Sequence, residues 1–184
     1  MKNGYNDTSM DFQETTFKYM KDLHSVAMRL TKNADEAEDL IQDTYLKAFR
    51  FFHKFKKGTN LRAWLFKIMM RLFYTRYRQK KLELIRTEPI PDEEIISLEA
   101  DPENAYLEKF VDKEIVNAID RLPQQFRTVL LLADVEELSY NEISEILKVP
   151  PGTIMSRLHR ARKKLANELR SYALENGLLS ATQT

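Results

Sequence analysis

The strongest constraint on the fold is a break in a helical pattern. Residues 82–102 contain three prolines among acidic side chains, whereas apolar residues recur at helical spacing on both sides of them. A structureless segment of this length rarely lies inside one compact domain, so we interpret it as a flexible acidic linker. We therefore expect two small helical domains, at 10–81 and 103–175, with a disordered N-terminus at 1–9 and a tail at 176–184.

Composition supports this all-α expectation. The chain has 184 residues, and its four glycines are too few for the many tight turns of an all-β fold. It has no cysteine, which excludes disulfides, thiolate metal sites and a cysteine nucleophile. The polar N-terminus does not resemble a signal peptide and no segment is apolar enough to insert in a membrane, so we expect a cytoplasmic protein.

The formal net charge of +1 hides a strong partition of charge along the chain. Residues 1–81 carry a net charge of +8 and residues 82–120 a net charge of −9. The segment 44–82 holds 12 Lys or Arg and 10 of the 19 aromatic residues, without one acidic residue. Cations that bind phosphates, interleaved with rings that stack on unpaired bases, are typical of proteins that bind single-stranded nucleic acid. The alternative is that most of these rings are core and that the charges form a solvated face.

The spacing of apolar residues predicts three helices in the first module. The first spans about 10–31, and Asn33 with Glu36 predicts a capped second helix at about 34–53. A third helix is expected at about 60–81. The buried stripe expected on this third helix is Leu61, Trp64, Leu65, Ile68 and Leu72.

The second and third helices each present a polar face opposite their apolar stripe. The polar face of the second helix consists of Glu38, Asp39, Gln42, Asp43 and Leu46. The corresponding face of the third helix consists of Lys67, Arg71, Tyr74 and Arg78. No acidic residue compensates the cations of this third helix, which favours an anionic partner over an idle solvated face.

The second module contains the most informative segment of the chain. Ser139 and Glu142 form a capping-box pattern that opens a short helix, and a turn at 149–152 leads into a second helix that begins near Pro151. The polar face of this second helix consists of Thr153, Ser156, Arg157, His159, Arg160, Lys163 and Lys164. A capped helix, a tight turn and a helix with a basic flank predict a helix-turn-helix, whose second helix enters the major groove of DNA.

Together the two modules resemble the small bacterial sigma factors of the extracytoplasmic-function (ECF) group, in the sigma-70 family. The first module contains "NADEAEDLIQDTYLKAFRFF" followed by "GTNLRAWLFKI", similar to the polymerase-binding and promoter-melting segments of the family. The second contains "RLPQQFRTVLLLADVEELSYNEISEILKVPPGTIMSRLHRARKKL", similar to the region that reads the −35 promoter element. The resemblance implies a region 2 helical bundle and a region 4 helix-turn-helix.

The resemblance also implies a role for each polar face. It places Glu38, Asp39, Gln42, Asp43 and Leu46 at the β′ clamp of core RNA polymerase. It places Lys56, Lys57, Asn60, Lys67, Arg71, Tyr74 and Arg78 on the melted −10 strand of promoter DNA. It places Thr153, Ser156, Arg157, His159, Arg160, Lys163 and Lys164 on the −35 element, with the β flap of polymerase as a second contact. An anti-sigma factor is a further partner that the resemblance implies.

Three positions depart from the family pattern. Many members carry Asn where this chain has Arg71, and Lys or Arg where it has Met155. Members often have Gly where this chain has Glu137. None of these differences breaks a motif, but they change the promoter contacts that we expect.

No residue pattern predicts chemistry carried out by the chain itself. The three histidines, His24, His53 and His159, lack ligand spacing, so we expect no metal, no cofactor and no enzyme. Two interpretations remain: a sigma factor that directs polymerase to promoters, and a stand-alone helix-turn-helix regulator with a separate partner-binding module. The sequence favours the first, because a basic aromatic module suited to single strands has no role in the second.

Overall fold

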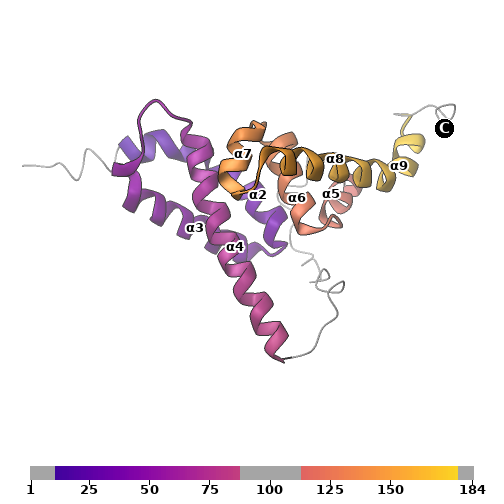
Figure 1. The fold of residues 1–184 in the computed structure, drawn as a ribbon, viewed down its shortest axis with the longest axis horizontal. Coiled ribbons are helices and arrows are strands. Elements are labelled where there is room, and N and C mark those ends of the chain that lie inside the picture. The colour runs from indigo at the N-terminus through magenta and orange to yellow at the C-terminus, as the bar shows by residue number, and fades with distance from the viewer. Residues whose placement is uncertain (1–10, 88–112, 178–184) are drawn as a thin grey trace, which may run out of the picture. The chain divides into compact units, whose positions relative to one another are not determined.

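The computed structural model describes residues 11–87 and 113–177 (Figure 1). Every element in these ranges is helical, which confirms the all-α fold class, and the chain divides into two compact units. The N-terminus 1–9, most of the linker expected at 82–102 and the tail from residue 178 lie outside the described residues.

The N-terminal helix of the first unit is interrupted where the sequence predicts one continuous helix. Residues 11–16 are α-helical, a 3-10 turn η1 follows at Phe17–Tyr19, and α2 spans Met20–Thr31. The hydroxyl of Thr16, just before the turn, donates to the carbonyl oxygen of Phe12 at 2.7 Å. Such a side-chain bond to the preceding turn is associated with bends in helices, and it lies where the chain changes from α to 3-10 geometry.

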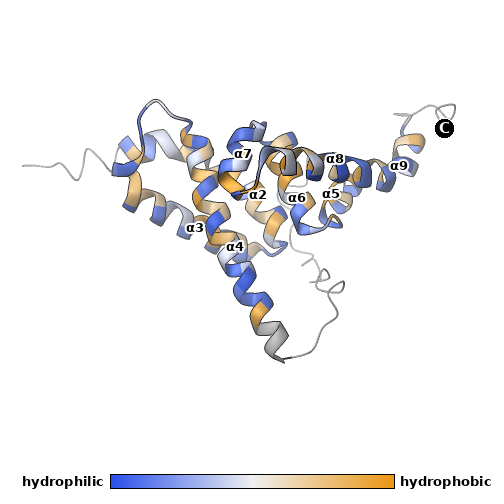
Figure 2. Ribbon diagram, viewed as in Figure 1, coloured by the Kyte–Doolittle hydropathy of each residue, from blue (hydrophilic) through white to orange (hydrophobic). Residues whose placement is uncertain are grey.

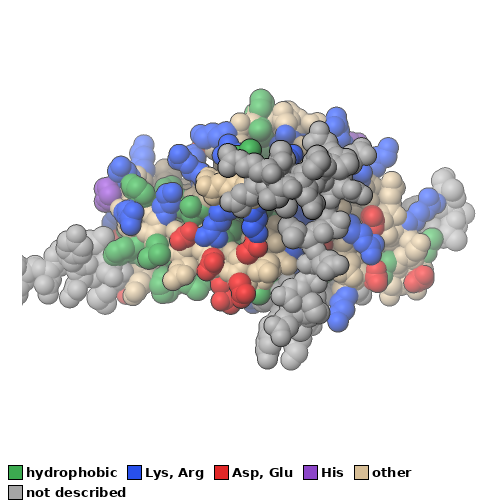
Figure 3. Space-filling view, turned by 90° about the horizontal axis from the view of Figure 1, so that it is seen from below, with side chains coloured by type: hydrophobic (Ala, Val, Ile, Leu, Met, Phe, Trp, Pro, Cys, Tyr) green, Lys and Arg blue, Asp and Glu red, His purple; other side chains and the backbone are tan. Residues whose placement is uncertain are grey.

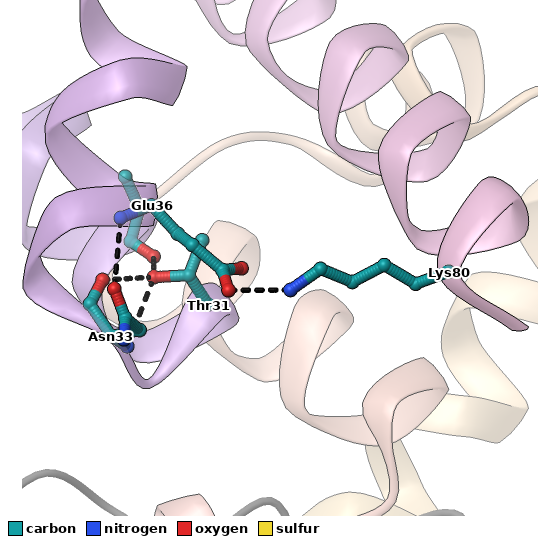
Figure 4. A network of polar contacts seen from close by, with 5 residues as sticks. Thr31, Asn33, Glu36 and Lys80 are labelled. Atoms are coloured by element: carbon teal, nitrogen blue, oxygen red, sulfur yellow. Dashed lines mark hydrogen bonds and ion pairs between the residues drawn. The ribbon is translucent and has the colours of Figure 1, made fainter. Parts of the chain in front are cut away.

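Helix α3 (Ala34–Phe51) begins at the predicted cap. The side-chain oxygen of Asn33 accepts a hydrogen bond from the backbone N–H of Glu36 at 2.9 Å (Figure 4). The second half of the expected capping box does not form. The carboxylate of Glu36 pairs with Lys80, and the backbone N–H of Asn33 bonds to the hydroxyl of Thr31 at 3.4 Å.

Helix α4 (Leu61–Thr87) follows a 3-10 turn η2 at Phe52–Lys54 and is longer than expected. It starts where the side-chain oxygen of Asn60 accepts from the N–H of Ala63 at 3.1 Å. It continues six residues past the end that the sequence predicts at residue 81. The sequence between 82 and 88 has no proline or glycine to stop a helix, and the first proline is Pro89.

The core of the first unit lies between α2, α3 and α4, because α3 packs against both of the other helices. The buried residues of α3 are Ala37, Leu40, Ile41, Thr44, Tyr45 and Ala48. The stripe predicted for α4 is wrong except for Leu65: the buried residues are Leu65, Phe66, Met69, Met70 and Phe73. Apolar residues surround the first half of α4 (Figure 2), so the neighbouring helices, and not its own pattern, select the buried side.

The second unit consists of short helices around α8. Its elements are α5 (Lys113–Asp120), α6 (Gln124–Leu130), a π-helical turn η3 (Leu131–Val135), α7 (Tyr140–Leu147), α8 (Pro151–Glu168) and α9 (Arg170–Glu175). Both α5 and α6 pack against α8. The residues with least exposure include Val129, Leu132, Ile143, Ile154 and Leu158.

A buried arginine fixes the connection between α5 and α6. Arg127 is 2% exposed, and its Nη2 donates to the carbonyl oxygens of Asp120 at 2.6 Å and of Leu122 at 2.9 Å. These carbonyls lie at the end of α5, where helical partners run out. The side chain of Arg127 therefore supplies hydrogen bonds that the helix itself does not.

Candidate functional site

The acidic face predicted on α3 is present and exposed. The side chains of Glu38, Asp39, Gln42, Asp43 and Leu46 all lie on the surface, whereas the residues between them are buried. Leu46 is 60% exposed, and the exposed rings of Phe49 and Phe17 extend the apolar part of this face. Figure 3 shows acidic side chains beside exposed hydrophobic ones on this unit. A surface of this kind suits a partner with both cations and apolar residues.

Two cations of α4 that the sequence pattern does not assign pair with acidic residues of α3. Arg76 Nη2 lies 2.5 Å from Asp43 Oδ2 and 3.3 Å from the carbonyl oxygen of Asp39. Lys80, one turn further along α4, pairs with Glu36 (Figure 4). The spacing of residues in the sequence is the signal that indicates these contacts, because positions 69, 73, 76 and 80 follow each other by four, three and four residues. They therefore lie on the side of α4 that faces α3.

The loop before α4 carries the first part of the predicted −10 site. Lys56, Lys57 and Asn60 are all exposed there. The hydroxyl of Thr59 donates to the carbonyl oxygen of Lys56 at 2.8 Å, and Lys57 Nζ lies 3.7 Å from Asp11 Oδ2. The side chain of Asn60 caps α4, which gives it a structural role in addition to the predicted one.

Aromatic rings pack beneath this loop. The ring of Phe55 is stacked on that of Phe52 at 6.1 Å and lies 5.3 Å from the ring of Trp64. Phe52 is buried, whereas Phe55 and Trp64 are half-buried. The three rings therefore form a partly exposed aromatic cluster that adjoins the lysines of the loop in sequence.

The second part of the predicted −10 site is one side of α4. Arg71 and Arg78 are exposed, and Lys67 and Tyr74 are half-buried, at the spacing that the sequence predicts. The guanidinium Nε of Arg78 donates to the carbonyl oxygen of Tyr74 at 3.2 Å. The four side chains form a basic strip along the helix, away from the side that contacts α3.

The helix-turn-helix predicted in the second unit is present. Ser139 N–H and hydroxyl donate to Glu142 Oε2 at 2.9 and 2.7 Å, and Glu142 N–H donates back to the Ser139 hydroxyl at 3.3 Å, so the capping box is complete. The turn is closed by the Ser144 hydroxyl, which donates to the carbonyl oxygen of Val149 at 2.7 Å. Pro151 is the first residue of α8, where its missing N–H costs no helical hydrogen bond.

Most of the predicted −35 face of α8 is exposed. Ser156, His159, Arg160, Lys163 and Lys164 are exposed, and Thr153 and Arg157 are half-buried. The opposite side buries Ile154, Leu158 and Ala161, which holds the helix against the core. Met155, one of the departures from the family pattern, is 55% exposed on α8.

One basic residue of α8 is held by an acid within the unit. Arg162 Nε and Nη2 donate to the two carboxylate oxygens of Asp134 at 3.0 and 2.6 Å. These hydrogen bonds, with smaller contributions from the charge of Asp134 and from Tyr140, raise the pKa of the Arg162 guanidinium above its ordinary value. Asp134 lies in η3 and Tyr140 opens α7, so Arg162 contacts both elements.

Two other kinds of site are absent from the part of the chain that the structure describes. Within residues 11–87 and 113–177, His, Asp and Glu side chains nowhere form a group of three that could hold a metal ion. None of the helices in these described ranges combines the length and the apolar character needed to cross a bilayer.

Comparisons with known proteins match each of the two units to a sigma-70 region. The model of "Sigma-70 region 2" matches residues 18–83, and that of "Sigma-70, region 4" matches residues 112–165. The ECF RNA polymerase sigma factor EcfG of Rhodopseudomonas palustris is 38% identical over 145 residues, which are 78% of this chain and 77% of EcfG. The ECF RNA polymerase sigma factor SigE of Mycolicibacterium smegmatis is 34% identical over 155 residues, and the match spans 83% of this chain but 59% of SigE.

A solved structure is similar over most of the chain. It is the sigma factor RpoE of Bartonella quintana in complex with the anti-sigma factor NepR. The TM-score is 0.72 at 30% sequence identity, over 87% of this chain and 97% of that chain.

Proposed function

This chain belongs to the ECF group of sigma-70 factors, which direct RNA polymerase to promoters, and we propose that each of its two units supplies one half of promoter recognition. The first unit binds core polymerase and the −10 strand, and the second binds the −35 element. The observation that carries the proposal is that both sigma-70 regions occur in one chain, each with an exposed polar face on a packed helix.

The acidic face of α3 is the proposed contact with the β′ clamp of polymerase. Asp39 and Asp43 supply negative charge, and Leu46 supplies an exposed apolar side chain beside them. Complementary charge speeds association and selects the partner, and a few residues near the centre carry most of the affinity in many interfaces. Lysines or arginines around an apolar patch are the matching features that we expect on the clamp.

The loop at 56–60 and the strip on α4 are the proposed −10 site. Lysines there attract the phosphates of a melted strand. The half-buried rings of Phe55 and Trp64, which contact each other, provide faces on which an unpaired base stacks. Stacking of a base on an aromatic side chain contributes about 1–3 kcal/mol. Arg71, Tyr74 and Arg78 then follow the strand along the helix.

The exposed face of α8 is the proposed −35 site. In a helix-turn-helix the first residues of the second helix contact base edges, and its later cations contact phosphates. Ser156, Arg157, His159 and Arg160 therefore take part in base or backbone contacts, and Lys163 and Lys164 bind phosphates. The β flap of polymerase is a second partner of this unit.

Two partners complete the proposed role of the chain: an anti-sigma factor and RNA polymerase. An anti-sigma factor inhibits the chain, since the similar structure of RpoE was solved in complex with one. The chain supplies recognition without catalysis of its own, because RNA polymerase carries out the chemistry, and it acts in the cytoplasm with that polymerase.

Transcription in vitro tests the proposal directly. The purified chain is added to sigma-free core polymerase on fragmented genomic DNA, and transcript starts are mapped with and without it. Discrete starts that depend on the chain, and that share an upstream sequence, support the proposal. Specific binding of duplex DNA without polymerase, and no chain-dependent transcript, would instead favour a stand-alone regulator. A variant with Asp39→Lys, on the docking face, is the matched control and should produce fewer transcripts.

A further inference from the structure

We infer that Arg162 is a positioning residue that orients the −35 helix and does not itself contact DNA. This inference rests on the proposed function of α8. Arg162 lies in a basic run, between Arg160 and the pair Lys163 and Lys164, and its sequence context alone favours a phosphate contact. Three features of the second unit point to the other role.

The first feature is the position of Arg162 around the helix. Successive residues of an α-helix are about 100° apart, so Arg162 lies about 200° from Arg160 and close to the side of Leu158. Leu158 is 1% exposed and belongs to the buried stripe of α8. The side chain of Arg162 therefore leaves the helix beside the core, on the side away from Arg160 and Lys164 of the proposed DNA face.

The second feature is the geometry of its ion pair. Two different nitrogens of the guanidinium reach two different oxygens of Asp134, at 3.0 and 2.6 Å. Such bidentate pairs fix orientation better than a single contact, because the planar guanidinium matches the carboxylate. Tyr140 lies near the same guanidinium, so one side chain connects α8 to η3 and to the first residue of α7.

The third feature is the π-helical turn that carries Asp134. In η3 the N–H of Glu136 donates to the carbonyl oxygen of Leu131, five residues earlier, at 2.9 Å. Leu131 and Leu132 remain buried in this turn, while Asp134 is exposed and faces α8. A wider turn changes the direction of the side chains that follow it, and π turns often occur at functional positions. Here the turn presents the carboxylate that Arg162 binds.

The orientation of α8 affects its contacts with bases more than its contacts with phosphates. Base contacts depend on the angle at which a helix enters the major groove, whereas phosphate contacts tolerate small shifts. Loss of the pair between Arg162 and Asp134 therefore lowers the preference for the correct −35 sequence. It leaves the number of phosphate contacts unchanged, and the salt dependence of binding reports that number.

The test uses holoenzyme reconstituted from core polymerase and the full chain. Binding is measured on a promoter fragment with its −35 element and on one with that element scrambled, over a series of salt concentrations. The variants are Arg162→Ala and Asp134→Asn, with Lys163→Ala as a matched control from the same helix. For Arg162→Ala we expect a preference for the −35 element that is about two- to fivefold lower, with an unchanged salt dependence. For Lys163→Ala we expect a shallower salt dependence, by about one counterion, and an unchanged preference.

The Asp134→Asn variant separates the two roles because each role predicts a change in a different quantity, either the DNA affinity or the preference for the −35 element. Removing this negative charge strengthens DNA binding if Arg162 contacts a phosphate, because the guanidinium is then released to the DNA. It weakens the −35 preference if Arg162 positions the helix. Tighter binding by Asp134→Asn, or a shallower salt dependence for Arg162→Ala, would overturn the inference.

The exchanged double variant, Asp134→Arg with Arg162→Asp, provides a rescue test. It restores an ion pair at the same place, so part of the −35 preference should return. No recovery, with thermal unfolding equal to that of the wild type, would also count against the inference. If the wild-type holoenzyme itself does not distinguish the two fragments, the −35 role of α8 is wrong and the proposed function fails with it.

Discussion

The carboxylate of Asp43 on α3 accepts a hydrogen bond from the guanidinium of Arg76 on α4, with Oδ2 and Nη2 2.5 Å apart. Lys80 of α4 pairs with Glu36 of α3, so the two helices run antiparallel and their interface continues beyond the apolar contacts in ion pairs. The side chain of Asp43 is 50% exposed despite this pair. A carboxylate has room for more than one donor, so Asp43 remains available to a second cation. The proposed docking face is thus also part of the contact between α3 and α4.

Charge reversal on this face tests the contact with polymerase. We expect Asp39→Lys to weaken binding to core polymerase strongly and to leave the fold intact, because its side chain is exposed. Asp43→Lys also brings a lysine next to Arg76, so it should reduce the free energy of unfolding by up to about 1 kcal/mol as well. Core affinity is measured by fluorescence anisotropy, and unfolding is measured by circular dichroism.

The exchange Asp43→Arg with Arg76→Asp separates these two effects. It restores an ion pair between α3 and α4, so stability should recover, while the docking face still lacks its acid and core binding stays weak. Glu175→Lys, on α9, is the control for a general effect of charge. Core affinity equal for Asp39→Lys and Glu175→Lys would contradict the docking role of the acidic face.

A second prediction concerns Arg160, which is exposed on α8. Arg160→Ala should reduce transcription from a promoter that needs its −35 element, by about 1–3 kcal/mol in binding if the side chain contacts a base. Arg170→Ala, which removes a cation from α9, should have little effect. The measurement is transcription in vitro on promoters with intact and altered −35 elements. Equal activity of the variant and the wild type on the intact promoter would argue against a base contact.

Features that depend on neighbouring residues could be predicted from the sequence. The side chains of Asn33 and of Ser139 with Glu142 cap their helices as their spacing indicates, because a cap involves residues only three apart. The polar faces predicted for α3 and α8 also lie on the surface. On each helix a single apolar stripe is buried, and it defines the opposite, polar side.

Features that depend on distant residues could not be predicted in the same way. The buried stripe predicted for α4 is wrong because the apolar residues of this helix do not form a single stripe. Packing against α3 determines which of them are buried. The pairs of Asp43 with Arg76 and of Asp134 with Arg162 join residues 33 and 28 positions apart. Their partners become evident only when the helices are placed side by side.

A third prediction concerns the backbone at Glu137. Its φ is 51°, in the left-handed region that disfavours residues with a side chain. This conformation costs about 1–2 kcal/mol for an ordinary residue, and replacement by glycine removes that cost. Glycine also makes the unfolded chain more flexible, which cancels about 0.5–1 kcal/mol of the gain in stability. We therefore expect Glu137→Gly to raise the free energy of unfolding of the second unit by about 0.5 kcal/mol.

Glu137→Ala is the matched control for this change, since it removes the same charge but keeps a Cβ. It should give no such increase. Urea unfolding of the three proteins at neutral pH provides the comparison. If glycine and alanine have equal effects, the gain comes from charge and not from relief of backbone strain.

A fourth prediction concerns the stability of the first unit at alkaline pH. Burial, with a smaller contribution from Asp22, raises the pKa of Tyr45 from 10.0 to about 12, and its hydroxyl donates to the carbonyl oxygen of Thr16 at 3.1 Å. A raised pKa means that the folded state keeps a proton that the unfolded state loses. The contribution of Tyr45 is therefore complete below pH 10 and is lost as the pH rises from 10 through 12. Its full size is about 2–3 kcal/mol.

Tyr45→Phe tests this expectation. At neutral pH the variant should lose about 1 kcal/mol with the hydrogen bond to Thr16. Between pH 10 and 12 its free energy of unfolding should fall less steeply than that of the wild type, because the buried phenol is absent. Tyr19→Phe, at a half-buried tyrosine, is the control and should keep the wild-type slope. Urea unfolding across this pH range measures the slopes, and parallel curves for Tyr45→Phe and the wild type would show that the phenol of Tyr45 does not control alkaline unfolding.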